Sequence, residues 1–184
     1  MSAIAYLTAA LFTMVSFAQE TTRMHTVKFE IPEAGIAFEL PSGWSLFGKM
    51  GTLAQGRVEY NYTHGYVEGN GIVINPSIVV TVDKGSWFDD EKNYLEEKIQ
   101  FYNAMGDTIE RTYPPGDKNN PLQLKAYYSE GTSGEEDHPH GERYILITFW
   151  TKKSGVHMEI HTSEKELKTK ALSYNAILKS IRKI

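Results

Sequence analysis

The stretch Arg143–Thr162, with the sequence RYILITFWTKKSGVHMEIHT, decides the fold. Its first half is a nearly unbroken apolar run, and a β-strand turns alternate side chains to opposite faces. One face would carry Tyr144, Leu146 and Trp150, and the other Ile145, Ile147 and Phe149. Two apolar faces are typical of a central strand that is covered on both sides.

A turn and a second strand follow in the same stretch. Lys152–Gly155 predicts the turn, in which Gly155 is free to take a positive φ. The next strand has one apolar face, made by Val156, Met158 and Ile160, and one polar face, made by His157, Glu159 and His161. Because a helical pattern begins directly afterwards, we expect an antiparallel sheet with helices packed on it.

Strand signals recur along the rest of the chain. Alternating residues predict strands at 26–31, 36–40, 58–62, 108–113 and 122–128, and a strand at 72–82 that is interrupted at Pro76. The first two form a hairpin, and the segment 48–56 has the composition of a loop. Few of these strands are linked by helices, which favours a mainly antiparallel sheet.

Two helices are predicted to pack on this sheet. The mid-chain helix begins near Ser86 and ends near Gly106, and its apolar face carries Phe88, Leu95, Ile99 and Tyr102. The C-terminal helix begins at a capping box formed by Ser163 and Glu166. Its buried stripe consists of Leu167, Ala171, Tyr174, Leu178 and Ile181. The expected fold class is therefore α+β.

Length and composition are those of one globular domain. The chain has 184 residues, of which 41% are hydrophobic and 23% charged. The net charge of −4 argues against a general nucleic-acid binder. From Lys152 onward, eight Lys and Arg stand against three acidic residues, a net of +5 that leaves −9 for the rest of the chain. We interpret this basic segment as a solvated helix face, with a binding patch as the alternative.

The N-terminus is typical of a targeting segment. Ile4–Phe17 is mostly apolar, and small residues at Ser16 and Ala18 predict cleavage before Gln19. We expect residues 1–18 to be a signal peptide and 19–184 one domain that is secreted or periplasmic, without a transmembrane anchor. The segment lacks the usual Lys or Arg, and the alternative is an N-terminal strand or buried helix. The absence of Cys rules out a lipoprotein anchor, disulfides and Cys metal sites.

Two short motifs resemble a known family. Phe38–Trp44 (FELPSGW) is similar to the opening of the PsbP-like or Mog-type family, which includes PsbP, Ran-binding Mog proteins and DcrB-like envelope proteins. Ala176–Ile181 (AILKSI) resembles the closing helix of that family. The resemblance covers about Val27 to Ile184 and implies an α/β/α sandwich around a mainly antiparallel central sheet. The motifs are packing features that imply no catalytic residue, and the members are accessory and binding proteins of unrelated systems.

One constellation could carry metal chemistry. His157, Glu159 and His161 share a strand face, and two imidazoles and a carboxylate are ligands that zinc accepts. His138 and His140, in an acidic loop, could add ligands. The alternative is a polar strand face that is solvated or lies under a helix edge, and we favour it. We therefore expect no cofactor.

A second group could bind a ligand through aromatic rings. Tyr60, Tyr62, Tyr66 and Trp87 could line a sugar or peptide surface, with sheet packing as the favoured alternative. The sequence has no phosphate-binding loop and no G-x-S-x-G nucleophile elbow.

These observations favour a binding protein over an enzyme. We expect a secreted or periplasmic, non-enzymatic binding or accessory domain with a protein or small-molecule partner and no affinity for nucleic acid. The alternative is a metal-dependent hydrolase that uses His157, Glu159 and His161.

Overall fold

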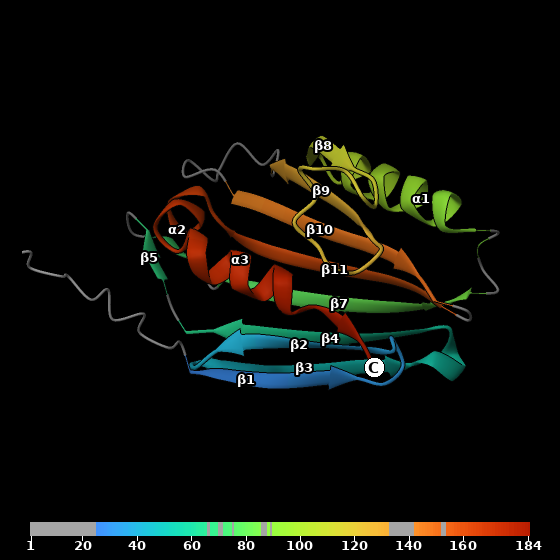
Figure 1. The fold of residues 1–184 in the computed structure, drawn as a ribbon, viewed down its shortest axis with the longest axis horizontal. Coiled ribbons are helices and arrows are strands. Elements are labelled where there is room, and N and C mark those ends of the chain that lie inside the picture. The colour runs from blue at the N-terminus through green and yellow to red at the C-terminus, as the bar shows by residue number, and fades with distance from the viewer. Residues whose placement is uncertain are drawn as a thin grey trace, which may run out of the picture.

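The computed structural model describes residues 25–65, 67–69, 72–74, 76–85, 88, 90–132, 142–151 and 154–184, with backbone alone at 67–69, 72–74 and 142. A seven-stranded sheet in the order β3-β4-β7-β11-β10-β9-β8 runs through the molecule (Figure 1). Its strands are β3 (Trp44–Thr52), β4 (Arg57–His64), β7 (Ser77–Lys84), β8 (Thr108–Tyr113), β9 (Tyr127–Thr132), β10 (Glu142–Trp150) and β11 (Ser154–Ser163). Every neighbouring pair is antiparallel, which confirms the predicted sheet.

The hairpin β10–β11 lies at the centre of this sheet. Its register runs from Glu142 opposite Ser163 to Trp150 opposite Gly155. One face of β10 contributes Ile145, Ile147 and Phe149 to the main core, and the other contributes Tyr144 and Leu146 to a smaller core. The prediction that this strand is covered on both sides is confirmed.

One face of the sheet is covered by two helices and a small sheet. The helices are α2 (Glu164–Thr169) and α3 (Ala171–Ser180), and the small sheet consists of β1 (Thr26–Ile31), β2 (Ile36–Pro41) and β12 (Arg182–Lys183) (Figure 1). The predicted hairpin is the pair β1–β2. The hydroxyl of Ser180 fastens α3 to β2, because it accepts a hydrogen bond from the N–H of Glu39 at 2.8 Å and donates to the carbonyl of Ile177 at 2.7 Å.

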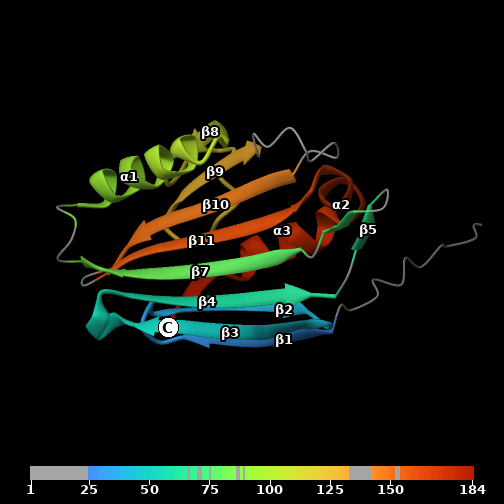
Figure 2. The same cartoon turned by 180° about the vertical axis from the view of Figure 1, so that it is seen from behind.

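The opposite face is covered only in part. Helix α1 (Glu91–Ala104) packs on β8 and β10, where Tyr102 meets Tyr144 and Leu146. From this side no described helix lies in front of β3, β4 or β7 (Figure 2). Strands β5 (Val67–Gly69) and β6 (Ile72–Ile74) form a separate two-stranded ribbon. The architecture is thus an α+β sandwich with helices on both sides of an antiparallel sheet.

Three strand boundaries differ from the prediction. Within the segment 48–56, residues 48–52 belong to β3 and Leu53–Gln55 form a short 3₁₀ helix, η1. After Trp44 this edge strand has no buried residue and therefore no apolar alternation. The predicted strand at 72–82 is two strands in different sheets. The strand at 122–128 begins only at Tyr127, because Asn120 holds the preceding loop through bonds from its side-chain amide to the carbonyls of Tyr113 and Ala126.

Both helices also differ from the prediction. Helix α1 begins after Asp90 rather than near Ser86, and the Asp90 carboxylate accepts a hydrogen bond from the N–H of Asn93 at 2.8 Å. Phe88 precedes the helix. The predicted cap of α2 is present, since Ser163 Oγ accepts from the N–H of Glu166 at 3.1 Å. The C-terminal helix is divided at Lys170, and this places Ala171 at the surface while Tyr174, Leu178 and Ile181 stay buried.

Gly155 is required for a reason other than the predicted positive φ. It is the second residue of β11 and is not among the positive-φ glycines. A Cβ at this position would lie 2.6 Å from the ring atom Cε2 of Tyr94, which is fully buried above it. Glycine therefore allows α1 to approach the sheet. Lys152 and Lys153, the start of the predicted turn, lie outside the described residues.

Replacing this glycine should loosen the contact between α1 and the sheet. Gly155→Ala should lower the free energy of unfolding by about 1–3 kcal/mol, the range for overpacking a filled core. Gly48→Ala is the matched control, because a Cβ at Gly48 meets nothing within 4 Å. Urea denaturation measures both, and equal stability of Gly155→Ala and wild type would contradict the assigned contact.

Candidate functional site

The polar face of β11 lies beneath α1. His157 is only 4% exposed, and Glu159 and His161 are partly buried. Opposite His157 on β10 stands Thr148, and opposite His161 stands Tyr144. The face is therefore polar in sequence and largely inaccessible to solvent at its centre.

Tyr102 of α1 connects the polar residues of this face. Its hydroxyl lies 2.7 Å from Glu159 Oε2 and 2.9 Å from His157 Nε2. The phenol has one proton, and it donates this proton to the carboxylate. The N–H at Nε2 of His157 must then donate to the phenol oxygen. The other ring nitrogen, Nδ1, accepts from the hydroxyl of Thr148 at 3.0 Å. This chain of bonds holds the imidazole neutral in one tautomer.

Burial determines the protonation of this network. Desolvation, reinforced by the positive charge of Lys98, lowers the pKa of His157 to about 3. Desolvation raises the pKa of Glu159, although the hydrogen bond from Tyr102 opposes this effect. The pKa of the Tyr102 phenol is also raised by burial. At neutral pH the imidazole is therefore uncharged and the phenol keeps its proton.

The three predicted metal ligands are arranged differently from a metal centre. Both ring nitrogens of His157 are engaged by Tyr102 and Thr148. The His161 ring stacks on Tyr144, with ring centroids 4.8 Å apart. Within the described part of the chain, no group of three or more His, Asp or Glu side chains could hold a metal ion. His138 and His140 lie outside the described residues.

A second buried polar group lies where α1 crosses the end of β7. Asp83 is fully buried, and it accepts hydrogen bonds from Arg57 Nε at 2.6 Å, Lys98 Nζ at 2.7 Å and the Tyr94 hydroxyl at 2.9 Å. Burial by itself would raise the pKa of Asp83, but the hydrogen bonds and charge of Lys98 and Arg57 more than offset it, and the pKa is lowered. The sequence reasoning missed Tyr94 and Lys98. The signal was the spacing of Tyr94, Lys98 and Tyr102, which places them on one helix face.

The two described members of the predicted aromatic group, Tyr60 and Tyr62, are both buried. Tyr62 is buried against the rings of Phe29 and Phe38. Tyr60 is also buried, and its hydroxyl donates to Glu33 Oε2 at 2.6 Å. Both rings thus belong to the packing between the two sheets. Tyr66 and Trp87 lie outside the described residues.

The lowered pKa of His157 predicts how the free energy of unfolding changes with pH. The pKa of His157 is near 6.5 in its ordinary state and about 3 in the folded protein, so between these values only the unfolded chain binds this proton. This group therefore reduces wild-type stability by up to about 1.4 kcal/mol per pH unit as the pH falls below 6.5. The raised pKa of Glu159 acts in the opposite direction and is present in wild type and variant.

We expect His157→Gln to be less stable than wild type at pH 7, because a glutamine cannot reproduce both hydrogen bonds. The stability difference between the two proteins should shrink as the pH is lowered from 7 to 4. Urea denaturation at several pH values measures it. A difference that stays constant over this range would contradict the burial of a neutral imidazole.

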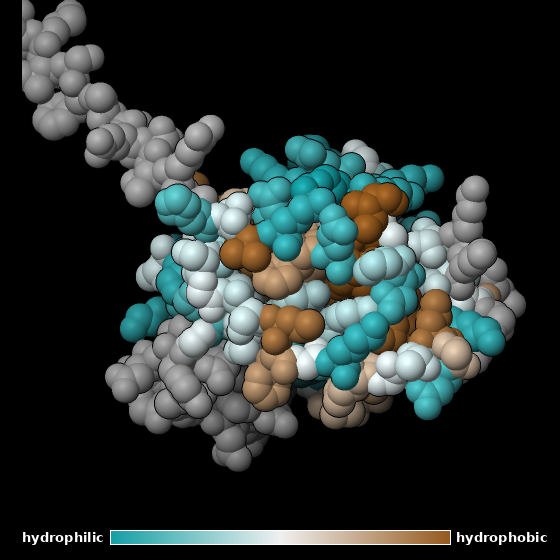
Figure 3. Space-filling model, turned by 90° about the horizontal axis from the view of Figure 1, so that it is seen from below, coloured by the Kyte–Doolittle hydropathy of each residue, from teal (hydrophilic) through white to brown (hydrophobic). Residues whose placement is uncertain are grey.

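Three exposed apolar side chains lie together at the outer edge of the main sheet. β3 ends the strand order, and Phe47 is 81% exposed, with Leu46 and Met50 also exposed. Beside them is a groove of about 460 Å³ whose lining includes Glu59 and Asn61 of β4. Figure 3, a view from the side of β1 and β3, shows several hydrophobic patches on this side of the molecule. We call the exposed side chains of Leu46, Phe47 and Met50, with this groove, the β3 edge.

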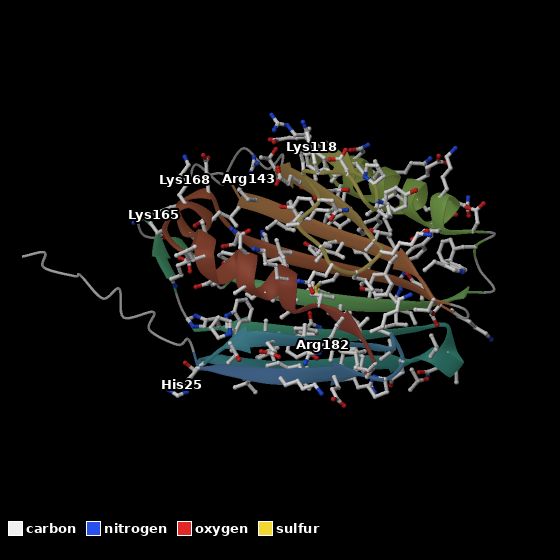
Figure 4. The ribbon with its side chains drawn as sticks, in the orientation of Figure 1. His25, Lys118, Arg143, Lys165, Lys168 and Arg182 are labelled. Atoms are coloured by element: carbon white, nitrogen blue, oxygen red, sulfur yellow. The ribbon has the colours of Figure 1, made fainter. Side chains whose placement is uncertain are left out.

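Three basic residues of the C-terminal segment, Lys168, Lys170 and Arg182, form ion pairs with nearby acids. Figure 4 shows Lys165, Lys168 and Arg143 near α2, at one end of the molecule. Lys168 pairs with Glu164 at 2.6 Å. Lys170 pairs with Glu166 and Arg182 with Glu39, and Arg143 of β10 pairs with Glu110. This supports a solvated charged surface rather than a binding patch for nucleic acid.

No protein-family model matches the chain, and no curated protein matches it significantly. Solved structures do share its fold. The Ran-binding protein Mog1p of Saccharomyces cerevisiae is 11% identical, with a TM-score of 0.54, and the match covers 86% of this chain and 95% of that protein. A point mutant of Mog1 is 9% identical, with a TM-score of 0.52, covering 88% and 97%. Cyanobacterial PsbP from Synechocystis is 8% identical, with a TM-score of 0.48, covering 92% and 99%.

At these identities the likeness concerns the fold alone. It confirms the Mog-like fold that the motifs at Phe38–Trp44 and Ala176–Ile181 predicted. Both motifs have structural positions: Trp44 is buried in the main core, and Ser180 fastens α3 to β2. A relation to DcrB-like envelope proteins stays a prediction. The chain therefore has the α+β sandwich of the Mog proteins.

Proposed function

We propose that this chain is a non-enzymatic binding or accessory domain that recognises a protein partner through the β3 edge. The observation that carries the proposal is the exposure of Leu46, Phe47 and Met50 on an edge strand beside a groove. Large apolar side chains gathered at a surface and bordered by polar groups are typical of protein interaction sites. The polar border here includes Glu59, which accepts a hydrogen bond from the Asn61 side-chain amide at 3.0 Å.

The position of these residues on an edge strand supports the proposal further. An edge strand presents backbone N–H and C=O groups on its outer side, and partners often pair with such an edge. β3 has nine residues and β4 as its neighbour in the main sheet. The fold neighbour Mog1p is described by its title as a Ran-binding protein, and this favours a protein as the class of partner.

No comparable observation supports the alternative, a metal-dependent hydrolase that uses His157, Glu159 and His161. The buried groups that could do acid–base chemistry, His157, Glu159 and Asp83, all have partners inside the protein. Their burial serves the packing of α1. No helix among the described residues is long and apolar enough to cross a membrane.

The β3 edge can be tested by removing its apolar side chains. Phe47→Ser with Met50→Ser should reduce recovery of the partner with the tagged chain, expressed in its own source, by more than about tenfold, since residues that anchor an interface contribute at least about 2 kcal/mol. Quantitative mass spectrometry of the purified complexes measures the recovery. Thermal unfolding should change little, because both side chains are exposed.

The matched control is Leu172→Ser. Leu172 is 83% exposed at the start of α3, away from the β3 edge, and its replacement should leave recovery unchanged. Equal recovery with the β3-edge variant and with wild type would refute the proposed surface. If only the Leu172 variant lost the partner, the interaction surface would be assigned to α3 instead.

We also propose that the domain acts outside the cytoplasm after loss of residues 1–18. The support is the apolar run Ile4–Phe17 followed by Ala18. Intact mass of the exported protein should show a chain that begins at Gln19. Ala18→Lys should block processing, whereas Ala18→Ser should leave it intact, since the peptidase requires a small residue there. A cytoplasmic protein that keeps Met1 would exclude both cleavage and export.

A further inference from the structure

A small pocket lies at one end of the sandwich, under the junction of α2 and α3. Its volume is about 180 Å³. The lining residues that matter are Trp44 at the start of β3, His64 at the end of β4, Glu166 of α2, Lys170 between the helices, and Tyr174 and Ile177 of α3. We call it the α2 pocket. It is distinct from the groove of the β3 edge, with which it shares no lining residue.

The carboxylate of Glu166 is the chemical feature of this pocket. Its side chain is 8% exposed, and Oε1 pairs with Lys170 Nζ at 2.6 Å. Among the residues that the structure describes, no side chain other than Lys170 is a hydrogen-bond or ion-pair partner of this carboxylate. In a complete capping box the carboxylate would accept from the N–H of Ser163. Here the Ser163 hydroxyl accepts from the N–H of Glu166, but the reciprocal bond is absent, and the carboxylate lines the pocket instead.

The walls of the pocket favour a cation. Trp44 and Tyr174 are both buried, and the His64 ring lies 5.6 Å from that of Trp44. Aromatic faces attract ammonium groups, and Trp does so best. A buried carboxylate that has one partner can accept further hydrogen bonds, so it gains from a second charged N–H donor and repels an anion. The volume is that of about six water molecules, so only a small head group would fit.

We propose that the α2 pocket binds a primary alkylammonium group. The ammonium would donate to Oε2 of Glu166, and its alkyl stem would lie between Trp44 and Tyr174. A free alkylamine and the end of a lysine side chain present the same chemistry. The proposal does not depend on the partner of the β3 edge.

Lys170 competes with an added ammonium for the Glu166 carboxylate. Its side chain is 46% exposed, and its ammonium already pairs with the same carboxylate. It therefore acts as an internal competitor that reduces the net negative charge of the pocket. Removing the Lys170 ammonium should strengthen binding of an added ammonium, whereas removing the charge of Glu166 should abolish it.

The test is an NMR titration of the ¹⁵N-labelled domain with n-butylammonium chloride at constant ionic strength set with NaCl. Saturable shifts are expected at the Trp44 indole N–H and at backbone amides of 163–177. Glu166→Gln, which keeps the shape of the side chain and the capped N–H, should weaken binding by about tenfold or more, the effect of losing a charge-assisted hydrogen bond. Lys170→Met should strengthen it about threefold or more. Glu164→Gln, an exposed acid on the same helix, should bind as wild type does.

A second titration distinguishes the source of the ammonium. The peptide acetyl-Gly-Lys-Gly-amide should reproduce the shifts if the pocket accepts a lysine side chain, and its failure beside success of n-butylammonium assigns the site to free amines. Equal binding by wild type and Glu166→Gln would overturn the proposal. It would also be overturned if the folded wild type and Lys170→Met both lack saturable shifts at Trp44, whatever the stability of the Glu166 variant.

Discussion

The fold depends on how α1 satisfies the polar residues that β7 and β11 bury beneath it. Tyr94, Lys98 and Tyr102 recur at every fourth residue and present their polar ends to the sheet. Two of them donate to Asp83, and the third donates to Glu159. A buried polar group that loses its partner costs about 1–3 kcal/mol, and more if it is charged. Sliding or rotating α1 would break these bonds together, so the polar contacts fix its position as apolar packing alone would not.

These hydrogen bonds between α1 and the sheet also determine which surface stays exposed to solvent. Because α1 is fastened over β10, β11 and the end of β7, it cannot extend across β3 and β4. On the other face of β4, Tyr60 and Tyr62 pack between that strand and the small sheet of β1 and β2. The side chains of β3 beyond Trp44 are therefore left at the surface. Exposure of Phe47 follows from the arrangement of the layers, and the same arrangement makes the β3 edge accessible to a partner.

The sequence predicts those parts of the fold that depend on residues close to one another in the chain. Apolar residues on both faces of 144–150 require a covered central strand, and Ser163 caps a helix through contacts within one turn. The sequence does not predict contacts that join distant segments. The bond between Tyr102 and His157 spans 55 residues, and nothing near His157 indicates whether it meets a metal, water or a phenol. For the same reason Gly155 suggests a turn, although its contact with Tyr94 is what requires a glycine.

The candidate surfaces could not be predicted from the sequence, because packing does not constrain the residues that form them. The two family motifs contribute packing: Trp44 fills the main core and Ser180 joins α3 to β2. Such requirements can be met at 11% identity, because a core asks only for apolar volume at the right positions. Surface residues such as Phe47 are free of that requirement and can change without loss of the fold. Shared architecture with Mog proteins therefore leaves the partner undetermined, and specificity must reside in the residues that packing does not constrain.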